Sequence, residues 1–176
     1  MFKKFVFLFL LGTVLVTGCK KDEPAKPTDE NADKIVGEWT MTAASCDDGV
    51  STSTINGSSI SSTFTWVAKD IDAKVVFKDD HTLDSHGSYT ITSITQTNGQ
   101  EITSVTPSGD YQFFGTWNLD GDVLETKNDG DDETAKGKIL VLDDHNLKTE
   151  IKATKTRTEN GIIQVSTQTV VATYTR

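Results

Sequence analysis

The chain has 176 residues, 35% of them hydrophobic, and a formal net charge of −9. This length provides for one domain with an ordinary core. An acidic chain repels nucleic acid and anionic lipid, which argues against DNA or RNA as a partner.

The first 18 residues have the parts of a secretory signal. Lys3 and Lys4 precede an apolar run of about 12 residues that ends in Thr17-Gly18. Roughly 20 apolar residues are needed to span a bilayer core, so the run is too short for a transmembrane anchor. We expect residues 1–18 to be removed, which leaves 15 basic against 26 acidic residues and a net charge of −11.

The next segment differs in composition from the rest. Residues 20–33 contain Pro24, Pro27, several charges and few apolar side chains. Such a composition predicts a flexible tether. With Cys19 it makes up residues 19–33, and we expect the folded domain to cover residues 34–176.

From there the chain has the pattern of β-strands. Apolar and polar residues alternate most clearly over residues 111–119, and no segment keeps helical spacing over three turns. Asn160-Gly161 is the strongest hairpin signal. We expect long loops at 47–59 and 128–135, and strands at 35–46, 60–68, 73–78, 82–94, 101–106, 111–119, 122–127, 136–142, 146–157 and 162–175. Short turns between consecutive strands predict an all-β fold, an antiparallel up-and-down meander closed as a barrel of about 8–10 strands.

Little in the sequence indicates chemistry. His81, His86 and His145 lie near Asp-rich turns, where exposed histidines are a simpler interpretation than a metal site. The acidic loop at 129–133 lacks the ligand spacing of an EF-hand. Asp47 and Asp48 follow Cys46, which argues against a reactive thiol there. No Gly-x-Ser-x-Gly elbow is present. We therefore expect a non-enzyme with no catalytic residue, no metal and no cofactor.

The end of the signal carries a more specific motif. Val16-Thr17-Gly18-Cys19 resembles the lipobox of bacterial lipoproteins. The resemblance implies diacylglyceryl on the Cys19 sulfur, cleavage before Cys19, and acylation of the new amine by a fatty acid such as palmitate. It makes the membrane a partner through the N-terminal lipid. A cleaved signal with a chance cysteine is the alternative.

The residues after Cys19 bear on location. Lys20 stands where an aspartate would resemble an inner-membrane retention signal, so the outer membrane is favoured. Lys21-Asp22-Glu23 resembles the signal of some surface-exposed lipoproteins, but an ordinary charged tether fits equally well. The periplasmic and the surface-exposed faces both remain open.

A second resemblance covers residues 34–176. Gly37-Glu38-Trp39 is similar to the Gly-x-Trp motif that opens the first strand of lipocalins and related calycins. Lipocalin-like domains of bacterial lipoproteins have further short motifs that match Val75-Val76-Phe77, Asp79-Asp80, Gly87-Ser88-Tyr89, Gly115-Thr116-Trp117 and the ending Tyr174-Thr175-Arg176. The resemblance implies that Trp39 closes one barrel end beside Gly37, with a basic side chain over it. Arg176 is the first candidate for that side chain and Arg157 the second. The helix and the disulfide usual in lipocalins are missing here.

Aromatic residues are the candidates for a binding site. Trp66, Phe64, Phe113, Tyr111 and Tyr89 would line a cavity if the barrel has one, and would otherwise be core. We therefore expect a lipid-anchored cell-envelope protein that binds a small apolar ligand without catalysis. The alternative is a surface adhesion or assembly module with a filled barrel core. The sequence identifies no protein partner.

Overall fold

A computed structural model describes residues 30–130 and 134–176. One short helix precedes nine antiparallel strands, which confirms the predicted all-β class. The elements are α1 (Glu30–Ile35), β1 (Gly37–Ile55), β2 (Ser58–Phe77), β3 (Thr82–Thr97), β4 (Gln100–Pro107), β5 (Tyr111–Asp120), β6 (Val123–Asn128), β7 (Ala135–Leu142), β8 (Asn146–Glu159) and β9 (Ile162–Thr175). In this part of the chain, no helix is long and apolar enough to cross a membrane.

The strands form a hydrogen-bonded ring. Their order is β2-β1-β9-β8-β7-β6-β5-β3-β4, and an additional pairing of β2 with β3 closes eight of them into the ring. Strand β4 lies outside the ring and pairs with the second half of β3, from Thr90 to Thr97. The predicted meander and the predicted range of strand number are both confirmed.

The expected loop at 47–59 is wrong. Strand β1 continues through these residues to Ile55, and β2 begins at Ser58. The segment is rich in Ser and Thr, and its threonines favour the extended backbone of a sheet. The turn is Asn56-Gly57, with φ of 49° and 82°. These positive values fit a two-residue hairpin turn.

The two strands expected at 60–68 and 73–78 are one continuous strand. The register of β2 against β3 shifts between Lys69 and Asp72, where one extra residue forms a β-bulge. Asp70 adopts a positive φ of 50° at this point. A bulge moves the side chains that follow it to the opposite face.

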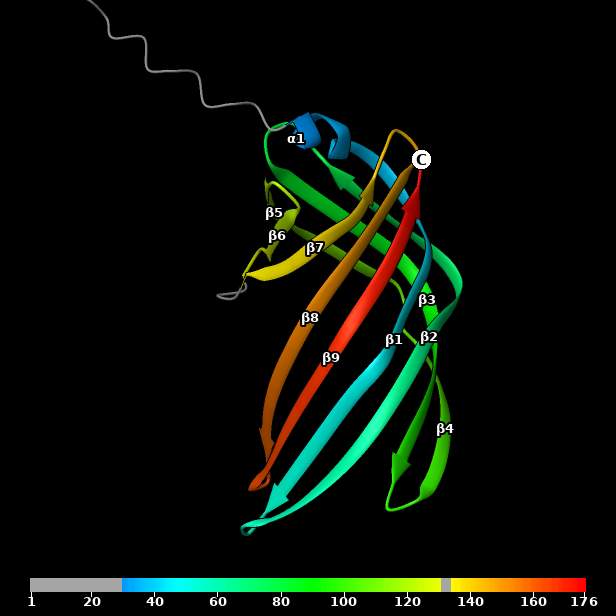
Figure 1. Cartoon of the computed structure of the whole chain (residues 1–176), viewed down its shortest axis with the longest axis vertical. Helices are drawn as coiled ribbons and strands as arrows, with labels where there is room; N and C mark the ends of the chain where they lie inside the picture. Colours follow the sequence, from blue (N-terminus) through cyan, green and yellow to red (C-terminus); the bar gives the residue numbers. More distant parts are fainter. Residues whose placement is uncertain (1–29, 131–133) are drawn as a thin grey trace, which may run out of the picture.

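Three hairpins extend the sheet at one end of the molecule. Their turns are Asn56-Gly57, Asn98-Gly99 and Asn160-Gly161, all with positive φ at both residues. The short strands β5, β6 and β7 do not reach this end, and the three tips lie opposite α1 and the C-terminus (Figure 1). We call residues 49–66, 91–106 and 153–168 the hairpin extension. It is a six-stranded sheet with free edges at β4 and at the end of β8.

The other end of the ring is packed. Its buried residues form one cluster, comprising Ile35, Trp39, Val75, Phe77, Leu83, Trp117, Leu119, Leu124 and Leu147. Helix α1 covers this end, where the sequence predicted tether residues and the start of a strand. The Trp39 indole N–H donates a hydrogen bond of 2.7 Å to the carbonyl of Ile35, which joins α1 to β1. We call the side of the sheet that carries this cluster the core face.

Candidate functional site

The structure brings Gly37, Trp39 and Arg176 together at the packed end. The guanidinium carbon of Arg176 lies 4.3 Å from the centroid of the Trp39 ring. A Cβ on Gly37 would lie 3.0 Å from the Arg176 Nη1 atom, and Gly37 has a φ of 132°. Glycine therefore suits this position both by backbone angle and by space. Arg157 lies far away, in the hairpin extension.

Arg176 also ties three chain segments together. Its side chain donates hydrogen bonds of 2.7, 2.8 and 3.0 Å to the carbonyls of Asp144, Val36 and Lys34. These carbonyls belong to the turn before β8, the start of β1 and the end of α1. The arrangement ties these segments together across one end of the ring.

The five aromatic residues predicted to line a cavity fall into two groups. Tyr89, Tyr111 and Phe113 form the first, which we call the aromatic cluster. The ring centroids of Tyr89 and Tyr111 are 5.8 Å apart, and those of Tyr111 and Phe113 are stacked at 5.2 Å. Along β5, Tyr111 and Phe113 alternate with exposed residues and share their face with the buried Trp117. The aromatic cluster therefore lies on the core face.

Phe113 differs from the core-face residues that follow it on β5, because 47% of its surface is exposed. Gly115, Trp117 and Leu119, which follow it on the same face of β5, are buried. Strand β6 pairs with β5 only from Gly115 onward, so the wall beside Phe113 lacks that neighbour. The interior of the ring is thus packed down to Gly115 and reaches solvent at Phe113.

Burial in this interior also changes the pKa values of two tyrosines. Burial raises the pKa of Tyr174 to about 12, and the nearby phenols of Tyr111 and Tyr89 raise it further. Burial also raises the pKa of Tyr111, although contact with the Ser85 hydroxyl opposes this effect. At neutral pH the phenols of Tyr174 and Tyr111 are therefore uncharged, which suits a mainly apolar occupant.

Trp66 and Phe64 form the second group, on β2. The Trp66 indole N–H donates a 3.0 Å hydrogen bond to the side-chain carbonyl of Gln168 on β9. Strand β1 lies between these two strands, so the indole extends across β1, where Cys46 is fully buried. Gln168 was missed by the sequence analysis. Its 102-residue separation from Trp66 gives no local signal.

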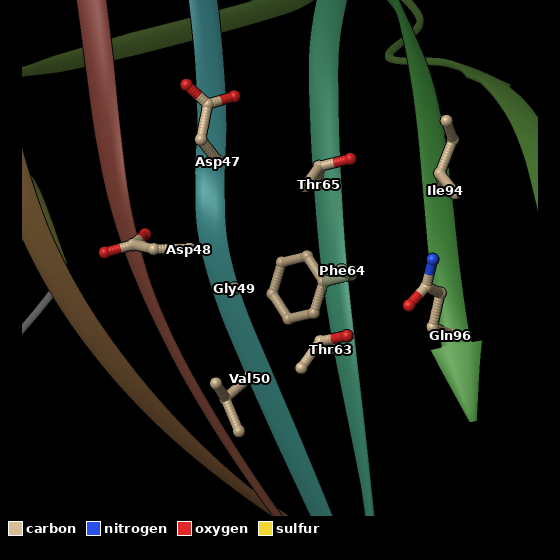
Figure 2. A pocket seen from close by; sticks show the side chains of 9 residues that line it. All are labelled: Asp47, Asp48, Gly49, Val50, Thr63, Phe64, Thr65, Ile94 and Gln96. Atoms are coloured by element: carbon tan, nitrogen blue, oxygen red, sulfur yellow. The ribbon is translucent and has the colours of Figure 1, made fainter. Parts of the chain in front are cut away.

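Phe64 packs directly on glycine. A Cβ on Gly49, the residue opposite Phe64, would lie 2.3 Å from the ring. This close approach requires glycine at position 49. The ring lies between β1 and β2 in Figure 2, which shows the surrounding hollow.

That hollow has a volume of about 310 Å³. It lies across β1, β2 and β3, and most of its side chains, such as Thr63, Thr65 and Ile94, alternate with core-face residues and so belong to the outer face. The lining consists of Asp47, Asp48, Gly49, Val50, Thr63, Phe64, Thr65, Ile94 and Gln96.

The carboxylate of Asp48 is already used within the sheet. It accepts hydrogen bonds of 2.7 and 2.6 Å from the backbone N–H and the hydroxyl of Thr169 on β9. In Figure 2 the Asp48 side chain points toward that strand. These bonds lower the pKa of Asp48. They occur where the β1–β9 register shifts, so Asp48 replaces backbone pairing lost at the bulge.

The remaining groups considered for chemistry lie apart. His81 packs on Trp117 at 4.9 Å, and His86 lies 3.4 Å from Asp84. Within residues 30–130 and 134–176, no three His, Cys, Asp or Glu side chains converge on a metal site. Burial raises the pKa of the Cys46 thiol, whose Sγ is 3.8 Å from Asp48 Oδ1. Cys19 and residues 131–133 of the acidic loop lie outside the described residues.

Comparisons with models of protein families, with curated proteins and with solved structures give no match for this chain. The class of the protein is defined here by its fold. It is an all-β protein whose strands form a hydrogen-bonded ring, packed at one end.

Proposed function

We propose that this is a lipid-anchored cell-envelope protein that binds a small, mainly apolar molecule inside its ring, without catalysis. The observation that carries the binding proposal is the position of Phe113. Its side chain lies on the core face, next to Tyr111, and is nevertheless 47% exposed. Aromatic surface that points inward and is not covered by the protein itself is typical of a ligand site.

The surroundings of Phe113 support an apolar occupant. Packed core closes the ring beyond Phe113, and the uncharged Tyr111 stacks beside it. Burial of aromatic surface contributes roughly 25 cal/mol per Å² removed from water, so even a small apolar molecule gains by covering these rings. Phenol hydroxyls supply the few polar contacts that orient such a ligand.

The anchor part of the proposal is supported by the lipobox-like segment that ends at Cys19 and by the lysine at position 20. Together they favour the outer membrane. Several acyl chains on one residue hold a protein firmly, because each buried methylene contributes about 0.8 kcal/mol.

One observation favours the alternative of an adhesion or assembly module. Ile102 and Val105 on β4 are each 64% exposed, and β4 pairs only with β3 in the described part of the chain. An edge strand with exposed apolar residues can pair with another chain. The ring interior at Phe113 favours small-molecule binding over this alternative.

Native mass spectrometry of the protein extracted from its membrane tests the binding proposal. We expect a retained small molecule that is lost from Phe113→Ser. Phe114→Ser is the matched control, because Phe114 is the next residue, is 51% exposed and points to the opposite face. Equal retention by both variants, or an empty wild-type protein that also takes up no apolar probe, contradicts the proposal.

A further inference from the structure

We propose that the core face of the hairpin extension binds an extended acidic glycan, a chain of sugar units that carry carboxylates. This site is distinct from the aromatic cluster, and the proposal does not depend on the apolar ligand. Three features of this face carry it: a fixed aromatic surface, a row of neutral hydrogen-bonding side chains, and two unpaired cations.

The aromatic surface is the Trp66 indole. It lies across β1 and is held by the 3.0 Å bond to Gln168, so its ring is fixed over the buried Cys46. Trp66 is partly exposed, so its indole is accessible to a ligand. The π face of an indole is electron-rich and attracts the C–H groups of a sugar ring.

A row of polar residues crosses all six strands of the hairpin extension. Register pairs Ser62 with Ser51 and with Thr97, and Ser166 with Ser51 and with Lys155. The full row, from β4 to β8, is Gln100, Thr97, Ser62, Ser51, Ser166 and Lys155.

Hydrogen bonds already order this row. Ser62 and Thr97 share one of 2.6 Å, and Ser51 accepts bonds of 3.0 and 3.3 Å from Gln164 and Ser166. Each hydroxyl has two lone pairs and one hydrogen, so every member of the row keeps capacity for a further partner. A polyhydroxylated chain can use this remaining capacity, while Ile60 and Ile102 add exposed apolar surface to the same face.

Few side chains on this face are charged, and all of them lie on one strand. On the core face of the extension, the register places charged residues only on β8, where they are Lys155, Arg157 and Glu159. Among the described residues, neither Lys155 nor Arg157 has an ion-pair partner. In a chain of net charge −9, this is a place where an anion meets cations without facing carboxylates from the neighbouring strands.

The positions also set the length of the ligand. The Trp66 ring lies over β1, which is two strand spacings, about 10 Å, from β8. A ligand that stacks on Trp66 and pairs with Lys155 or Arg157 must span that distance, which is more than a single sugar ring provides. We therefore expect oligomers to bind and monosaccharides not to bind measurably.

The test uses the full protein in a non-ionic detergent and titrates it with oligogalacturonate, a uronic-acid oligomer. The same oligomer with its carboxylates methyl-esterified is the uncharged comparison. Binding is followed by calorimetry and by tryptophan fluorescence. We expect the charged oligomer to bind about tenfold or more tightly than the esterified one. The change in tryptophan fluorescence that accompanies its binding should disappear in Trp66→Phe.

Two double variants separate the site from general electrostatics. Lys155→Gln with Arg157→Gln removes the core-face cations, and Lys148→Gln with Lys152→Gln removes the same charge from the opposite face of β8. We expect about tenfold or greater loss of affinity in the first and less than about twofold in the second. Equal loss in both, equal binding of the esterified oligomer, or no binding of the charged one overturns the proposal.

Discussion

The guanidinium of Arg176, the last residue of the chain, lies over the ring of Trp39, with 4.3 Å between the guanidinium carbon and the ring centroid. Trp39 is fully buried and belongs to the core, whereas the Arg176 side chain is bonded to three carbonyls at the surface. The two residues therefore contribute to stability by different means, and truncating each should give different losses.

Truncation of Trp39 to Ala should lower the free energy of unfolding by about 3–5 kcal/mol, the range for a large aromatic side chain removed from a core. Arg176→Gln should cost about 0.5–2 kcal/mol, the range for a cation over an aromatic ring. Equilibrium denaturation measures both. Trp117→Ala serves as the comparison. Trp117 is buried in the same core, and the side chain beside its ring is His81 and not an arginine. A wild-type midpoint for Trp39→Ala would contradict its place in the core.

The raised pKa of Tyr174 makes stability sensitive to high pH. The folded-state pKa, about 12, is above the ordinary tyrosine value of about 10, so the unfolded chain loses this proton first as pH rises. Stability from this group is complete below pH 10 and is lost between about pH 10 and 12, by roughly 2 kcal/mol or less. Denaturation midpoints measured across this range should fall less steeply in Tyr174→Phe than in the wild type. Parallel curves would show that Tyr174 is not buried as described.

The contact between Gly49 and Phe64 should appear as an energetic coupling. Gly49→Ala places a Cβ within 2.3 Å of the Phe64 ring, so we expect a loss of about 1–3 kcal/mol from overpacking. In a Phe64→Ala background the same change should cost much less, because the ring that it meets is gone. A double-mutant cycle by denaturation measures this, and additive losses would refute the contact.

The anchor proposal is tested at Cys19. Cys19→Ala should remove incorporation of labelled palmitate and release the protein from the membrane fraction, because no sulfur remains to carry the lipid. Cys46→Ala is the matched control and should keep both properties, since the Cys46 side chain is buried within the sheet. Labelled fatty acid in Cys19→Ala would end the anchor hypothesis.

Part of this structure could be predicted from the sequence. Strict alternation along residues 111–119 and the turns rich in Asp and Gly predicted the meander, because both signals are local. The hairpin extension was missed because Ser, Thr and Asn at 47–59 suggested a loop. Asn56-Gly57 between two alternating runs was the signal that would have revealed it.

The candidate sites were less accessible to prediction. The sequence pointed to aromatic residues as candidates but gave no reason to separate Tyr89, Tyr111 and Phe113 from Phe64 and Trp66. That division depends on strand register, and on the bulge at Asp70 that changes which residues of β2 face inward. The hydrogen bond from Trp66 to Gln168 crosses an intervening strand and likewise requires the register of three strands.

Helix α1 and the hairpin tips lie at opposite ends of the molecule (Figure 1). This arrangement has a mechanical consequence. Strand β1 starts beside α1 and continues to the tip at Asn56, paired with β2 on one side and β9 on the other (Figure 1). A pull between α1 and that tip acts along β1 and perpendicular to its inter-strand hydrogen bonds. The bonds on both sides of the strand are then loaded in shear at the same time, whereas a pull across the sheet would break them one after another.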